Sequence, residues 1–224
     1  MGQYYSPIIL SDDKKKVWGW LYSHDYDSGL KLMEHSWLKN DFVGAFESML
    51  VGMPRRVVWA GDYADEEYTK TVRRKENKDE LQRRKNLPEN KFKKLKAEMI
   101  TEELHVTLYD LCTDVNKLKP AGCTVKERYI VNHDTKEFID KRKVPISDTY
   151  TDEKTGKKYE YRIHPLPLMT CEGNNRGDGD FHINPSAKQG NTALIGTWAR
   201  NLISVEAKKP KGYKEVIFDL VEDR

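Results

Sequence analysis

The stretch HPLPLMTCEGNNRGDGDFH, His164 to His182, is an apolar run that ends in a glycine-rich, acidic loop. Glycine adopts positive φ, and lets another group approach the backbone closely, without a steric penalty. The run therefore predicts a buried element, and the loop after it predicts the place where a site would lie. The candidate side chains of this loop are Glu172, Asn174, Arg176, Asp178 and Asp180.

Three interpretations of the loop remain open. Its glycines would let backbone N–H groups surround a phosphate, which Arg176 could bind with two hydrogen bonds. Asp178 and Asp180 would repel a phosphate unless a cation such as Ca²⁺ or Mg²⁺ lay between them, but their spacing lacks the rest of an EF-hand loop. A tight exposed turn held by Asx hydrogen bonds needs no ligand. The sequence thus identifies neither a metal nor a cofactor.

Around this loop the chain predicts an α+β fold built from antiparallel hairpins. Helical spacing of apolar residues predicts one amphipathic helix from about Asp41 to Val51, with Asn40 or Asp41 as N-cap and Gly52 as its end. Pro7 lacks an N–H, so its strand is expected to be an edge strand or to start beyond it. The expected hairpins span residues 4–22, 126–140 and 144–161, and the other expected strands are 56–60, two within 193–206, and 213–221.

Two parts of the chain are weakly similar: each has a hairpin, a site-bearing link and a strand that is expected to end in Trp-Ala and a polar turn, at Trp59-Ala60 and Trp198-Ala199. Chance is the alternative explanation, because hairpin sequences commonly look alike. This similarity predicts two related halves, residues 1–65 and 105–224, in one globular domain, with residues 66–104 inserted between them. The expected core contains Ile8, Leu10, Val17, Trp20, Phe42, Phe46, Met49, Val57, Trp59, Ile130, Phe138, Leu166, Leu168, Ile195, Trp198, Ile203 and Ile217.

The insert concentrates the positive charge of the chain. Residues 70–96 hold twelve Lys or Arg against four acids, whereas the whole chain has a net charge of only +3. Such density attracts phosphate backbones or an acidic protein surface, although a solvated helix face would have a similar composition. We expect two helical stretches separated by Pro88. The candidate binding residues are Arg73, Arg74, Lys75, Lys78, Arg83, Arg84, Lys85, Lys91, Lys93 and Lys94.

Two His-acid pairs, His24-Asp25 and Glu34-His35, flank a glycine turn. Imidazole and carboxylate together suit a divalent metal or acid–base catalysis, although both histidines could simply hydrogen-bond within the turn. Asp62 and Asp65 follow the strand expected at residues 56–60, and strand ends often carry sites. Together with the loop at residues 172–180, these side chains would form the cleft of a metal- or nucleotide-binding hydrolase, which is the alternative function.

Four further stretches carry recognisable motifs: Met1–Tyr4, Gly29–Leu32, Trp59–Asp65 and Gly173–Asp180. They resemble an uncharacterised family of small phage and bacterial proteins that begin MGQY and carry GDYAD and GNGRGGGD-like motifs. The chain departs from the family at Asp178, where glycine is usual, and at Trp198–Asn201, where a second WAGD would stand. The resemblance implies a fold and a phage-encoded or accessory context, without an activity.

The composition also indicates the cellular environment of the protein. Three cysteines without CxxC spacing argue against a disulfide framework or a zinc knuckle and favour a reducing cytoplasm, that of the host if the protein is phage-encoded. Neither a signal peptide nor a membrane-spanning segment is expected. The favoured hypothesis is a non-enzymatic accessory protein, in host takeover or anti-defence, that binds nucleic acid or an acidic host complex through the insert.

Overall fold

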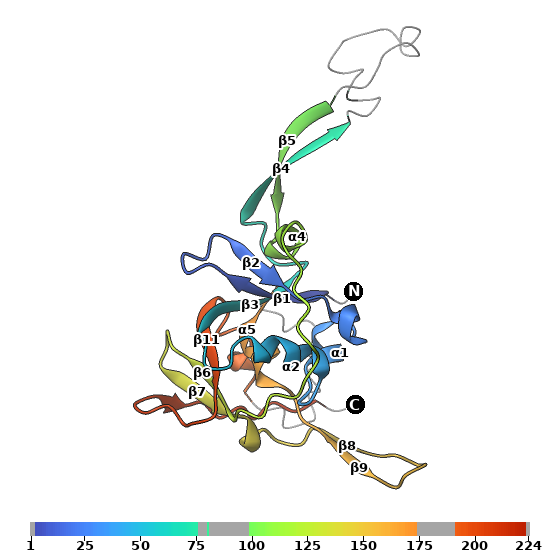
Figure 1. Ribbon diagram of the computed structural model, residues 1–224, viewed down its shortest axis with the longest axis vertical. Coiled ribbons are helices and arrows are strands. Elements are labelled where there is room, and N and C mark those ends of the chain that lie inside the picture. The colour runs from blue at the N-terminus through green and yellow to red at the C-terminus, as the bar shows by residue number, and fades with distance from the viewer. Residues whose placement is uncertain (1–2, 76–79, 81–98, 174–190, 223–224) are drawn as a thin grey trace.

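The computed structural model describes residues 3–75, 80, 99–173 and 191–222. Its main element is an eight-stranded, mostly antiparallel sheet, which confirms the α+β fold class. The strands of this sheet are β1 (Tyr5–Leu10), β2 (Val17–Trp20), β3 (Arg55–Gly61), β6 (Tyr129–Asn132), β7 (Glu137–Asp140), β10 (Cys171–Glu172), β11 (Asn201–Glu206) and β12 (Lys214–Glu215). Their order is β12-β7-β6-β11-β3-β1-β2, with β10 beside β3 (Figure 1).

The order of the strands is symmetric about the β3–β11 pair. In the first half, β1 pairs with β2 on one side and β3 on the other, and in the second half β6 pairs in the same way with β7 and β11. The halves thus share one connectivity and one continuous sheet, joined where Val57 pairs with Asn201. The two Trp-Ala pairs are not equivalent, since Trp59 lies within β3 whereas Trp198 precedes β11.

Side chains alternate between the two faces of a strand, and in β3 both faces are buried. Val57 and Trp59 point into the larger core, beneath the short helices α1 (Leu32–His35), α2 (Asp41–Ser48) and α5 (Pro165–Thr170). Val58 and Ala60 point to the opposite face, which helix α4 (Leu108–Cys112) covers. The central strand therefore lies between two helical layers.

Helix α2 begins where the sequence predicts it and ends three residues early, at Ser48. The Asn40 side chain accepts a hydrogen bond from the Val43 N–H at 3.1 Å, which caps the first turn. Of the helices formed by the described residues, none is long and apolar enough to cross a membrane.

The described part of the insert contradicts the helical expectation for residues 66–104. Tyr68–Lys75 (β4) and Met99–Val106 (β5) form an antiparallel ribbon, which we call the arm; it projects away from the body (Figure 1). Threonine and valine recur along both strands and favour extended backbone over helix. The expectation of helices around Pro88 lies outside the described residues.

A second, shorter hairpin, β8 (Asp148–Thr151) with β9 (Lys158–Tyr161), extends from the other end of the body (Figure 1). It confirms the hairpin expected at residues 144–161. Among the described residues there are also single turns of 3-10 helix: η1 (Ser23–Tyr26), η3 (Lys141–Lys143) and η5 (Thr192–Leu194).

Four further expectations were wrong in detail. The strand that contains Pro7 is internal in the sheet. It tolerates proline because Pro7 lies at the end of the β1–β2 pairing, where the Leu21 N–H donates to the Pro7 carbonyl and no N–H is needed from residue 7. Residues 193–206 form one strand instead of two. The last strand is reduced to β12, and Ile217 is 61% exposed instead of buried. The other expected core residues are buried or packed against the core.

We predict that Trp59→Ala lowers the free energy of unfolding by about 3–5 kcal/mol, because it empties the centre of the larger core. Trp18→Ala is the matched control: Trp18 is 55% exposed, and its loss should lower the free energy of unfolding by about 1 kcal/mol or less. Urea denaturation of both variants measures the difference. Equal losses would contradict the central position of Trp59.

Candidate functional site

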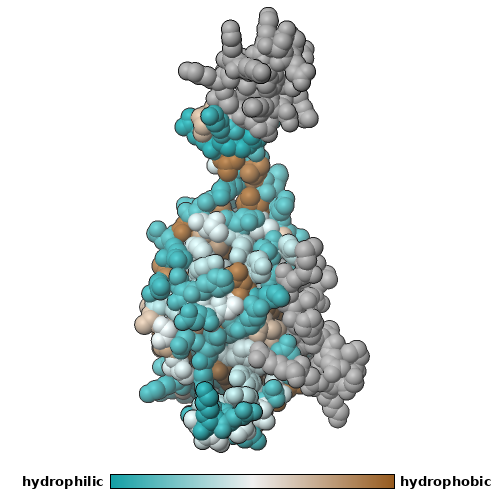
Figure 2. All heavy atoms as spheres, turned by 90° about the vertical axis from the view of Figure 1, so that its right-hand side faces the viewer, coloured by the Kyte–Doolittle hydropathy of each residue, from teal (hydrophilic) through white to brown (hydrophobic). Residues whose placement is uncertain are grey.

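The arm carries the described members of the predicted binding set, Arg73, Arg74 and Lys75, all in β4. The other seven, Lys78, Arg83, Arg84, Lys85, Lys91, Lys93 and Lys94, lie outside the described residues. Because side chains alternate along a strand, the arm has two different faces. Figure 2 shows hydrophobic surface on the stem of the arm, between its polar end and the body.

On the inner face of the arm the cations are paired. Arg74 donates to Glu102 and, through both terminal nitrogens, to Glu80, at 2.5–3.0 Å. Lys70 forms an ion pair with Asp114, just after α4, at 2.5 Å. These pairs neutralise the inner face and fix the arm against α4.

The outer face of the arm is exposed along its whole described length. It presents Arg73 and Lys75 from β4, Glu103 and His105 from β5, and Met99, which is 58% exposed. Thr69, Thr71 and Thr101 lie between them and add hydroxyl groups. Of these residues only Glu103 is acidic, so the outer face combines cations with neutral hydrogen-bonding groups.

Arg200 ties the base of the arm to the body. Its guanidinium donates to Glu67, just before β4, and to Glu172, in β10, both at 2.8 Å, and it lies over the Tyr68 ring. Burial raises the pKa of Glu172 in spite of the neighbouring Arg200. The ion pairs of Arg200 therefore connect the arm to the start of the glycine-rich loop.

The start of this loop lies at the same strand end as Asp62. Glu172 pairs with Ala60 in the parallel β10–β3 pair, and Asp62 directly follows β3. The backbone of Gly173 lies close to other groups: a Cβ on Gly173 would lie 2.2 Å from the Gln3 Oε1 atom. Asn174, Arg176, Asp178 and Asp180 lie outside the described residues.

His35 is a structural residue of the core. Its Nε2 atom accepts a hydrogen bond from Trp59 Nε1 at 2.9 Å, and its Nδ1–H donates to the Gly29 carbonyl at 3.0 Å. Burial lowers the pKa of His35 to about 4. Both nitrogens are occupied and the ring is neutral at pH 7, so this imidazole is not available to a metal or a substrate.

The other described members of the predicted cleft, apart from Asp65, have hydrogen-bond or ion-pair partners. His24 Nδ1 lies 3.2 Å from the Tyr22 hydroxyl, and Asp25 forms an ion pair with Lys117 at 2.8 Å, which lowers its pKa. Glu34 accepts from the Lys31 N–H and Asp62 from the Tyr4 N–H, while Asp65 is exposed. Among the described residues, no three His, Cys, Asp or Glu side chains are placed to share a metal ion.

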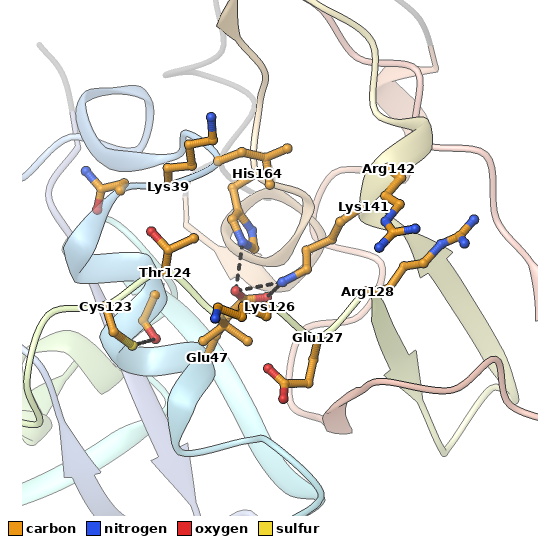
Figure 3. Close-up of a pocket in the computed structure, with 14 residues that line it drawn as sticks. Lys39, Glu47, Cys123, Thr124, Lys126, Glu127, Arg128, Lys141, Arg142 and His164 are labelled. Atoms are coloured by element: carbon orange, nitrogen blue, oxygen red, sulfur yellow. Dashed lines mark hydrogen bonds and ion pairs between the residues drawn. The ribbon is translucent and has the colours of Figure 1, made fainter.

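The sequence did not indicate a pocket of about 210 Å³ between α2 and the segment of residues 123–128. Three buried side chains form its floor: Glu47, Lys141 and His164 (Figure 3). Lys141 Nζ donates to both Glu47 carboxylate oxygens at 2.9 Å, and His164 Nε2 lies 3.3 Å from Glu47 Oε2. Burial disfavours the charged carboxylate, but His164 and Lys141 outweigh it and lower the pKa of Glu47.

His164 is fixed from behind. Its Nδ1 atom accepts the Leu166 N–H at 3.1 Å as the N-cap of α5, so the ring proton that faces Glu47 is on Nε2. The sequence weakly indicates the ion pair at the floor of the pocket. Glu47 has no basic residue three or four positions away in α2, so a buried Glu47 needs a partner from a distant segment.

The segment of residues 123–128 crosses α2 at Gly44 and forms one wall of the pocket. Cys123 Sγ donates to the Gly44 carbonyl at 3.3 Å, and a Cβ at position 44 would lie only 1.7 Å from the Cys123 oxygen. Any larger residue at position 44 would push this wall away. Glycine at this position is what allows the pocket to form.

We predict that His35 makes stability depend on pH. Its folded pKa is about 4 and its unfolded pKa about 6.5, so the unfolded chain binds the proton first and stability falls as the pH drops from about 6.5 to 4. Between pH 7 and pH 5 this effect should remove about 2 kcal/mol from the free energy of unfolding.

Urea denaturation at several pH values checks this prediction in the wild type and in the His35→Gln and His24→Gln variants. The His35→Gln variant should show the smaller pH dependence, and His24→Gln, at an exposed ring, should match the wild type. His133, whose pKa burial also lowers, is present in all three proteins and cancels in the comparison. Equal pH dependence in all three would contradict a neutral, buried His35.

Comparison with known proteins gives no match: no protein-family model, no curated protein and no solved structure is similar to this chain at a significant level.

Proposed function

We propose that the protein is a non-enzymatic accessory protein that binds duplex DNA with its arm. The observation that carries the proposal is the arm itself, a two-stranded ribbon that projects from the body with one cationic, hydroxyl-rich face exposed. The phage or bacterial context implied by the sequence resemblance fits such a role, for example in host takeover or anti-defence in the cytoplasm.

The shape of the arm favours DNA among nucleic acids. The major groove of B-DNA is wide enough for a two-stranded β-ribbon, whereas the deep, narrow major groove of A-form RNA is not. Arg73 and Lys75 would contact phosphates, and the hydroxyls of Thr69, Thr71 and Thr101 could donate to phosphate oxygens.

The exposure of the arm also favours a partner. A two-stranded ribbon is only marginally stable by itself in water, and within the described residues the contacts of this one with the body come mainly from α4 and Arg200. Residues 76–98, which connect β4 to β5 in the sequence, continue the basic composition. Since the inner-face cations are already paired, the outer face and this segment are where phosphates would bind.

We predict that Arg73→Glu/Lys75→Glu weakens DNA binding. Removing two phosphate contacts should lower the slope of log affinity against log salt by about 2. Fluorescence anisotropy with a labelled duplex at several salt concentrations measures it. Lys208→Glu/Lys211→Glu, an equal charge change at exposed positions between β11 and β12, is the control and should leave the slope nearly unchanged.

Equal losses in the two double variants would show that only net charge matters and would contradict binding through the arm. Binding of wild-type protein to an acidic protein surface without any binding to DNA would contradict the nucleic-acid proposal and favour the other partner class.

We also predict that the distal segment contributes affinity but not stability. Lys75 and Met99 are paired residues at the ends of β4 and β5, so Asn-Gly can replace residues 76–98 as a two-residue type I′ turn. This variant should bind DNA more weakly and melt within a few degrees of the wild type, because Lys75 and Met99 lie at the exposed end of the arm and Arg74 keeps its ion pair with Glu102 when Glu80 is removed.

The matched control replaces residues 152–157 with Asn-Gly between the paired residues Thr151 and Lys158 of the β8–β9 hairpin. It should change neither DNA affinity nor melting temperature. A large fall in melting temperature on replacing residues 76–98, or unchanged affinity, would contradict the role given to this segment.

A further inference from the structure

The pocket above Glu47 has an excess of positive charge at its rim. Lys39, Lys126 and Arg142 line it and are exposed, and within the described parts of the chain none of them has a carboxylate at ion-pair distance. The acids that line it are Glu47, which is paired with Lys141, and Glu127. The rim therefore favours an anion.

The two arginines at the rim differ in their partners. Arg128 forms a bidentate pair with Asp140, whereas for Arg142 only the backbone N–H contacts that carboxylate. Figure 3 shows the side chains of Arg128 and Arg142 on the same side of the pocket, beyond Lys141. Within the described residues Asp140 thus neutralises Arg128, whereas the guanidinium of Arg142 keeps its donors for an anion.

The floor of the pocket offers the opposite chemistry. A carboxylate has about four acceptor positions, and Glu47 uses some of them for Lys141 and His164, so others can accept from a ligand hydroxyl. A buried ion pair adds little to stability compared with apolar residues of the same size. Its position below an open pocket is therefore better explained by ligand binding than by packing.

Size restricts the ligand. Pockets for drug-sized molecules measure about 300–1,000 Å³, and this one measures about 210 Å³. We propose that the pocket binds a small sugar or polyol phosphate, with the phosphate at the cationic rim, where Arg142 has free donors, and a hydroxyl donating to Glu47. This site is separate from the arm and goes beyond the proposed DNA binding.

Isothermal titration calorimetry of the full chain with ribose 5-phosphate tests the proposal, with ribose and inorganic sulfate as comparison titrants. We expect saturable binding of ribose 5-phosphate that is tighter than binding of either titrant, because only ribose 5-phosphate satisfies both rim and floor. Lys126→Gln/Arg142→Gln should weaken this binding about tenfold or more. These side chains are exposed, so the variant should fold.

Lys208→Gln/Lys211→Gln is the matched control and should bind ribose 5-phosphate like the wild type. Binding no tighter than that of sulfate, or equal weakening in the two double variants, would overturn the proposal. The Arg73→Glu/Lys75→Glu variant should keep wild-type binding of ribose 5-phosphate, so a failure of DNA binding and a failure of the pocket are distinguishable.

Discussion

The hydrogen bond from Trp59 to His35 is the contact on which the rest of the body depends. It joins the central strand β3 to helix α1 inside the larger core, at full burial of both rings. The rings of Phe42 and Phe46 from α2 pack edge-on against Trp59, at centroid distances of 6.0 and 5.0 Å. A buried indole N–H without an acceptor would be destabilising. The neutral imidazole of His35 supplies this acceptor and so allows a tryptophan at position 59.

The sequence predicted the local elements well where apolar spacing and turn residues agree. Helix α2 follows from its N-cap and from the i, i+4 pair Phe42 and Phe46, and the hairpins follow from short apolar runs around polar turns. The arm was missed because its Lys, Arg and Glu residues favour helix, whereas its β-branched residues pair in register with a strand more than twenty positions away. The density of charged residues alone does not distinguish a helix from a β-strand.

The candidate site shows a similar limit. The sequence predicted a catalytic or metal-binding His35 because an imidazole beside a carboxylate suits such chemistry. The sequence pattern does not show that the indole N–H of Trp59 donates to the second nitrogen of this ring. Conversely, Glu47, Lys141 and His164 come from three distant segments with no common spacing. Only the fold places them together, with Gly44 allowing a further segment to close above them.

One edge of strand β3 pairs only with strands that come much later in the sequence. One side pairs with β1, which precedes β3, but the other side pairs with β10 and β11, and Asn201 lies 144 positions after its partner Val57. During synthesis on the ribosome this apolar edge would remain open until β11 has emerged. Pairing over such sequence separation is slow, and an open edge invites association with other chains. The protein should therefore be most vulnerable to aggregation, and most dependent on chaperones, just before β11 is synthesised.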